Sequence, residues 1–149
     1  MRGRTPGNDG AGGDRSALAR ALEVQERASG LGFDWQEPAG ALEKVFEEAG
    51  EVADLVAAAA RGVPDHTATQ AELGDLLFAV VNLARLARVD PARALDQATG
   101  KFVMRFREVE RLARARGLPL PGTALERLDG IWDEVKRRER GSGGPTSPV

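Results

Sequence analysis

The sequence predicts an all-α fold, a bundle of about five helices. No stretch of the 149 residues alternates apolar and polar side chains with period two, the pattern of a half-buried strand. Alanine, leucine, glutamate and arginine dominate the segments between the breaks, and all four favour helices. Glycine and proline gather at a few breaks, where they end helices.

The first predicted helix covers about residues 16–28, with Ser16 as its N-cap, because a serine hydroxyl can accept a hydrogen bond from the first turn. The connector at 29–38 carries two glycines and a proline, which mark a loop. The second helix covers about 39–61 and ends before a glycine and a proline, residues that stop helices.

The third predicted helix covers about 67–87, and one of the threonines at its start is the expected cap. The fourth covers about 91–116. Asp90 caps it, and proline occupies the first helical position, where its missing N–H does no harm. The fifth opens at Thr123 and reaches about 138.

The second and third predicted helices each carry an apolar stripe with an acidic pair beside it. At about 100° per residue, the stripes comprise Val45, Ala49, Val52, Ala53 and Val56 on the second helix and Leu73, Leu76, Val80, Leu83 and Ala84 on the third. Glu48 lies at the edge of its stripe and Glu51 just outside it, while Glu72 and Asp75 hold the same offset on the third helix. Two antiparallel helices packed on these stripes would direct four carboxylates into one space.

These carboxylates predict a metal site. Each pair is spaced i, i+3, which puts both side chains on one helix face, and unpaired charge beside apolar residues is unfavourable. Carboxylate oxygens are the ligands that Mg²⁺ and Mn²⁺ prefer. No histidine or cysteine joins the group, which argues against zinc and against a di-iron site with a Glu-x-x-His motif. From pattern alone, a solvated acidic face stays an equal alternative.

The third helix also predicts an oligomer. Phe78 and Val81 lie on the face opposite its stripe, and a helix that is apolar nearly all round is buried on both sides. One face is therefore expected to pack against a second subunit.

Composition excludes several classes of protein. The net charge of −2 gives no electrostatic basis for binding nucleic acid. No apolar run is long enough to span a membrane, and the N-terminus lacks the apolar segment of a signal peptide. The absence of cysteine fits a reducing cytoplasm. Residues 1–13 and 141–149, rich in glycine, serine and proline, are expected to be disordered tails around one domain at 14–140.

Several motifs make the chain recognisable. EEAGE at 47–51, followed by ELGD at 72–75, resembles the EExxE…ExxD signature of the MazG family of nucleoside triphosphate pyrophosphohydrolases. The similarity continues in LARALEVQERASGLGFDW at 18–35, KFVMRFREVE at 101–110 and LDGIWDEVKRR at 128–138, and it covers about residues 17–138. Many members carry two such domains in tandem, and this chain carries one.

The resemblance implies an all-α bundle that forms a homodimer or homotetramer. It implies cleavage of a nucleoside triphosphate between the α and β phosphates, with Glu48, Glu51, Glu72 and Asp75 as ligands of Mg²⁺, for which Mn²⁺ can substitute. The metal would neutralise phosphate charge and activate water. Glu47, the remaining acid of EExxE, is expected to support catalysis together with Glu48 and Glu51.

The resemblance also implies substrate-binding residues. The matching positions are Lys101, Arg105, Trp132, Lys136, Asn82 and Trp35. Arginine grips phosphate oxygens bidentately and lysine acts as a point charge, and an indole can stack on a base. Two alternatives stay open: a related all-α pyrophosphatase, such as a dimeric dUTPase or a phosphoribosyl-ATP pyrophosphohydrolase, and a helical interaction module without catalysis.

Overall fold

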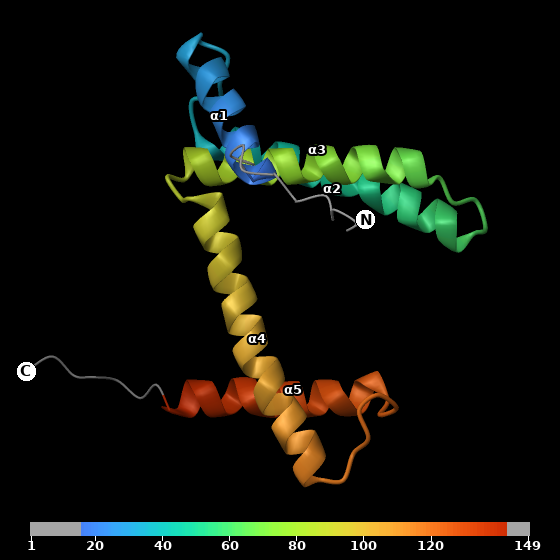
Figure 1. Ribbon diagram of the computed structural model, residues 1–149. Helices are drawn as coiled ribbons and strands as arrows, with labels where there is room; N and C mark the ends of the chain where they lie inside the picture. Colours follow the sequence, from blue (N-terminus) through green and yellow to red (C-terminus); the bar gives the residue numbers. More distant parts are fainter. Residues whose placement is uncertain (1–15, 143–149) are drawn as a thin grey trace, which may run out of the picture. The chain divides into compact units, whose positions relative to one another are not determined.

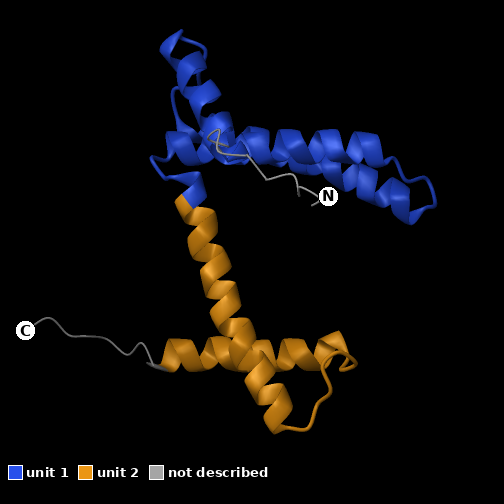
Figure 2. Ribbon diagram, viewed as in Figure 1, with its two compact units in different colours: residues 1–92 blue, residues 93–149 orange. Residues whose placement is uncertain are grey.

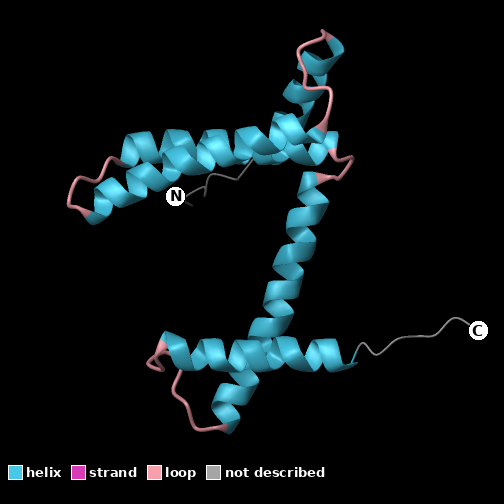
Figure 3. Ribbon diagram, turned by 180° about the vertical axis from the view of Figure 1, so that it is seen from behind, coloured by secondary structure: helices cyan, strands magenta, loops and turns pink. Residues whose placement is uncertain are grey.

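The computed structural model describes residues 16–142, and over this range it contains helices and loops but no strand (Figures 1 and 3). Its five α-helices are α1 (Ala17–Gly30), α2 (Pro38–Ala60), α3 (His66–Leu86), α4 (Pro91–Ala115) and α5 (Leu125–Ser142). The all-α prediction is confirmed. No helix among the described residues combines the length and the apolar character needed to cross a bilayer.

The starts of α1 and α4 confirm two predicted caps. The Ser16 hydroxyl accepts a hydrogen bond from the Ala19 amide at 3.3 Å. The Asp90 carboxylate accepts one from the Ala92 amide at 2.9 Å, and Pro91 occupies the first position of α4. Both side chains satisfy amide groups that the first turn leaves without helical partners.

The start of α3 differs from the prediction. Asp65 is the cap, since its carboxylate accepts from the Ala68 amide at 2.9 Å. Thr67 lies inside the first turn, and Thr69 donates its hydroxyl back to the Asp65 carbonyl at 2.7 Å. The helix therefore starts one residue earlier than expected, because aspartate and threonine compete for the same role.

The last helix also differs at both ends. It begins at Leu125 and not directly after Thr123. The Thr123 hydroxyl donates a hydrogen bond to the Pro119 carbonyl at 2.8 Å. The helix continues to Ser142, four residues past the expected end at 138. The expected tail at 1–13, and the part of the C-terminal tail after 142, lie outside the described residues.

The chain divides into two units, residues 1–92 and 93–149 (Figure 2). In the first unit α2 and α3 run antiparallel side by side, and α1 packs against α3 (Figure 1). In the second unit α4 and α5 pack through an apolar cluster, with Trp132 against it. The cluster comprises Val109, Leu112, Ala113, Ile131 and Val135.

The face of α2 that is buried differs from the predicted stripe. Glu48 is 5% exposed, so it lies on the inner face itself and not at its edge. Ala49 and Ala53 are exposed, and Val56 is 59% exposed. A helix with apolar residues on two sides has two possible stripes, and residue type alone does not say which one packs inside the protomer.

The predicted stripe of α3 is only partly buried, since Leu76, Leu83 and Ala84 are half-buried. Ala79 and Val81 are buried, whereas Leu73 and Val80 from the predicted stripe are each 43% exposed, and Leu77 is 61% exposed. Leu73, Leu77 and Val80 follow i, i+4, i+7 spacing and form an exposed apolar row on one face.

Candidate functional site

Three of the predicted metal ligands come together between α2 and α3. Glu48 and Glu51 on α2 and Glu72 on α3 each place a carboxylate oxygen within 4.8 Å of the others. The i, i+3 spacing puts the first two on one side of α2, and the antiparallel neighbour brings the third against them. Three of the four predicted carboxylates, from two helices, therefore lie within reach of one another.

The charges in this cluster are only partly balanced. Lys44 lies 2.5 Å from one oxygen of Glu48 and lowers the pKa of that carboxyl below its usual range. The other oxygen, Oε2, is buried and has no hydrogen-bond partner among the described residues. The carboxylates of Glu72 and Glu48 raise the pKa of Glu51, as expected where like charges crowd.

These features fit a divalent cation. An orphaned buried carboxylate oxygen and a neighbouring carboxyl with a raised pKa both gain from added positive charge. An all-oxygen donor set is what Mg²⁺ and Mn²⁺ favour. The residues present therefore suit a hard metal ion.

The other two acidic residues of the signature lie apart from this cluster. Asp75 is not among the three grouped carboxylates and instead lines the cavity beside them. Glu47 has a side chain that is 59% exposed and lies 3.1 Å from Lys44. The structure therefore groups three of the four predicted ligands.

The cavity occupies the first unit and has a volume of about 370 Å³, within the range typical of small-molecule sites. Its lining comes from α1, the connector, α2 and α3. The apolar lining residues are Val24, Ala28, Phe33, Trp35, Ala41, Phe78 and Ala79, and the polar ones are Gln25, Asp34, Lys44, Glu48, Asp75, Asn82 and Arg85. Glu48 belongs to both the carboxylate cluster and the cavity, so the two adjoin.

An ion pair ties the connector to α3. Asp34 and Arg85 lie 2.5 Å apart, and both side chains are mostly buried. Arg85 also donates from Nε and a terminal nitrogen to Oδ1 of Asn82, at 3.0 and 2.8 Å. The hydrogen bond from Arg85, assisted by one with Ser29, lowers the pKa of Asp34 from 3.8 to about 2. This network fixes the loop that forms one wall of the cavity.

Trp35 lies directly against the backbone of α2. A Cβ added to Gly40 would stand 2.3 Å from Cδ1 of the indole, a separation that neither group tolerates. The glycine thus provides the space for the indole, which is 42% exposed and lines the cavity.

The predicted phosphate-binding residues lie in the second unit. Arg105 makes a bidentate contact with Glu139, with Nε 2.9 and 3.1 Å from its two oxygens, and its guanidinium lies 6.0 Å from the centre of the Trp132 ring. Lys136 pairs with Asp133 at 2.8 Å. Lys101 is exposed. These cations are arranged along α4 and α5.

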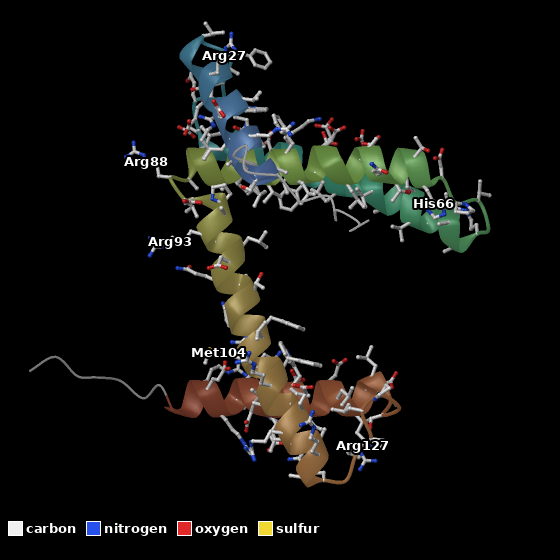
Figure 4. All side chains as sticks on the ribbon, in the orientation of Figure 1. Arg27, His66, Arg88, Arg93, Met104 and Arg127 are labelled. Atoms are coloured by element: carbon white, nitrogen blue, oxygen red, sulfur yellow. The ribbon has the colours of Figure 1, made fainter. Side chains whose placement is uncertain are left out.

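Among the residues of the site that the sequence did not predict are Lys44, Arg85 and Gln25. Lys44 could have been found, because it precedes Glu48 by four residues, the spacing of a helical ion pair. Arg85 and Gln25 act through partners far away in the chain, which sequence spacing does not reveal. His66, the one histidine of the sequence, is exposed at the start of α3 beside the α2–α3 loop (Figure 4) and does not line the cavity.

Comparison with known proteins gives a consistent result. A family described as the MazG nucleotide pyrophosphohydrolase domain matches residues 36–110. The chain is 45% identical over 123 residues to the nucleoside triphosphate pyrophosphohydrolase of Escherichia coli K12, covering 83% of this chain and 46% of that protein. It is 42% identical over 120 residues to the nucleoside triphosphate pyrophosphohydrolase/pyrophosphatase MazG of Thermotoga maritima, and the match covers 80% of this chain and 44% of that protein. The chain thus spans less than half the length of these two relatives.

Proposed function

Because this chain belongs to the MazG nucleotide pyrophosphohydrolase family, we propose that it hydrolyses nucleoside triphosphates between the α and β phosphates. The products are a nucleoside monophosphate and pyrophosphate. The substrates are ribo- or deoxynucleotides, canonical or damaged, and the reaction removes unwanted members from the nucleotide pool.

The observation that carries this proposal is the carboxylate cluster beside the cavity. Glu48, Glu51 and Glu72 suit a hard cation, and the adjoining apolar cavity has the size of a small-molecule site. A triphosphate needs a cation for its phosphates, and its base needs an apolar pocket. The two features lie side by side in one unit.

The metal we propose is Mg²⁺, with Mn²⁺ as a possible substitute. Glu48, Glu51 and Glu72 would hold it, with Asp75 as the fourth ligand from the edge of the cavity. When bound, it would neutralise phosphate charge and lower the pKa of water. Glu47, exposed and paired with Lys44, would have a supporting role.

The remaining predicted residues would bind the rest of the substrate. Trp35 and Asn82 line the cavity and would contact the nucleoside. Lys101, Arg105, Trp132 and Lys136 of the second unit are proposed as substrate-binding residues by resemblance to the family. Binding would then require the Arg105 guanidinium to exchange or share its contact with Glu139.

We further propose that the protein works as a homodimer or homotetramer in the cytoplasm, without nucleic acid or membrane partners. The exposed row of Leu73, Leu77 and Val80 supports assembly, because an apolar row on a helix tends to be covered. The absence of cysteine fits a reducing compartment.

The test is to incubate the purified chain with ribo- and deoxynucleoside triphosphates and Mg²⁺ and to separate the products by anion exchange. Monophosphate and pyrophosphate, lost on adding EDTA, are expected, and the same panel distinguishes a dUTPase-like preference. Diphosphate with orthophosphate would show that another bond is cleaved.

Two variants test the site. Glu48→Gln and Asp75→Asn should abolish turnover while far-UV circular dichroism stays unchanged. Glu43→Gln, an exposed position on the same helix, is the matched control and should keep its turnover. Full activity in both site variants would contradict the assignment, and a lack of nucleotide binding by the wild type would favour a helical interaction module.

A further inference from the structure

One polar group in the cavity has no role in the metal site. Gln25, on α1, is 5% exposed and lines the cavity. Its Nε2 donates to the backbone carbonyl of Phe78 on α3 at 2.8 Å. Its Oε1 is buried and lacks a hydrogen-bond partner among the described residues.

The orientation of this amide follows from its neighbour. A carbonyl oxygen only accepts hydrogen bonds, so the NH₂ end of Gln25 must face Phe78. The oxygen end is therefore fixed on the opposite side, and it can be satisfied only by a donor. A buried acceptor without a partner is unfavourable and rare in folded proteins.

The nearby amide of Asn82 has the opposite character. Asn82 is 7% exposed, and its Oδ1 already accepts two hydrogen bonds from Arg85. Its NH₂ group is consequently the end that remains to donate. Besides its charged residues, the cavity lining thus includes apolar and aromatic residues such as Trp35 and Phe78, the amide of Gln25 with its unpartnered acceptor, and the amide of Asn82.

We propose that Gln25 is a specificity-determining residue that accepts a hydrogen bond from a ring or exocyclic N–H of the nucleotide base. A flat heterocycle with a donor and an acceptor on one edge fits this combination, and nucleobases have such edges. The inference rests on the proposed function, since it assigns the cavity to the base of the triphosphate. A site built to accept from an N–H rejects an analogue that lacks it, because the buried acceptor then stays unpaired.

The experiment compares matched nucleotides on the full chain with Mg²⁺. Each natural triphosphate is paired with an analogue whose base lacks the N–H at the Watson–Crick edge: unsubstituted purine for adenine and guanine, 2-pyrimidinone for cytosine, and N3-methyluracil for uracil. The wild type should prefer the natural member of its best pair by about tenfold or more in kcat/KM, the ratio expected for one hydrogen bond.

The variant is Gln25→Met, which keeps the length of the side chain but lacks the amide. In Gln25→Met, the ratio of kcat/KM for the natural nucleotide to kcat/KM for its analogue should fall to near one, because only the natural nucleotide loses a hydrogen bond. Gln70→Met, at an exposed position of α3, is the control and should keep the wild-type ratio. If Gln25 only docks α1 on α3, both nucleotides of the pair lose kcat/KM equally and the ratio is unchanged, which would overturn the proposal.

Failure of the proposed function would be recognised separately. If no triphosphate is hydrolysed, calorimetry with the same natural and analogue nucleotides still measures the binding ratio in the wild type and in Gln25→Met. A ratio that falls in the variant would support base recognition without turnover. Absence of binding, or a ratio unaffected by the substitution, would refute it.

Discussion

Replacement of Gly40 by alanine tests whether Trp35 is held against α2. The added Cβ would stand 2.3 Å from Cδ1 of the indole, about 1 Å closer than the 3.4 Å at which ordinary contact begins. Relief of such overpacking usually costs about 1–3 kcal/mol, whereas alanine gains about 1 kcal/mol of helix propensity over glycine. The variant should therefore be up to about 2 kcal/mol less stable, unless the half-exposed indole swings into solvent.

Displacement of the indole has a second, measurable consequence. Stacking of a base on an aromatic side chain contributes about 1–3 kcal/mol, so loss of the Trp35 position should raise the KM for nucleotide about tenfold. Gly50→Ala in the same helix is the matched control, because nothing lies within 4 Å of its added Cβ. Gly50→Ala should gain about 1 kcal/mol in urea unfolding. A Gly40→Ala variant with the stability of Gly50→Ala and the KM of the wild type would refute the packing described here.

Three further predictions concern charge and assembly. Lys44→Met should strengthen Mg²⁺ binding in calorimetry, because the ammonium 2.5 Å from Glu48 competes with the metal; weaker binding would show that Lys44 assists it. Asp34→Asn should lower the free energy of unfolding above about pH 4, and the difference from the wild type should disappear as the pH falls toward 2. The reason is that the folded-state pKa of Asp34 lies below its ordinary 3.8, so the stabilisation needs the ionised form. A difference in unfolding free energy that stays constant across this range would contradict the prediction. Leu77→Glu should convert the proposed oligomer to monomers in sedimentation with helicity intact, since Leu77 lies in the exposed apolar row. An unchanged mass would contradict an interface at this row.

The sequence predicts helix ends well where the cap depends only on residues close by in the chain. Ser16 and Asp90 were identified as caps because the capping hydrogen bond reaches only two or three residues along the chain. The cap of α3 was missed because Asp65 and the threonines after it are all suitable capping residues. A choice between neighbouring candidates depends on backbone angles, which residue type does not specify.

The inner face of the α2–α3 pair could not be predicted in the same way. Glu48 was expected at the edge of an apolar stripe, but it is buried on the inner face, whereas Val56 is 59% exposed. Both sides of these helices are apolar, so hydrophobicity alone favours neither. The role of Gln25 depends on a carbonyl 53 residues away, and such a contact becomes visible only when α1 and α3 are placed together.

The charge state of the carboxylate cluster argues for its role as a cation site. Lys44 neutralises one carboxylate from 2.5 Å, and the raised pKa of Glu51 means that this carboxyl holds a proton more readily than usual. The ammonium of Lys44 and a proton on Glu51 are both positive charges that can be displaced. A divalent cation can therefore supply the positive charge that balances these carboxylates. A purely structural core would remove the repulsion with an apolar residue, since such exchanges often stabilise a protein. A cluster of three carboxylates, one with an orphaned buried oxygen, instead supports the proposed cation site, because binding sites commonly sacrifice stability for function.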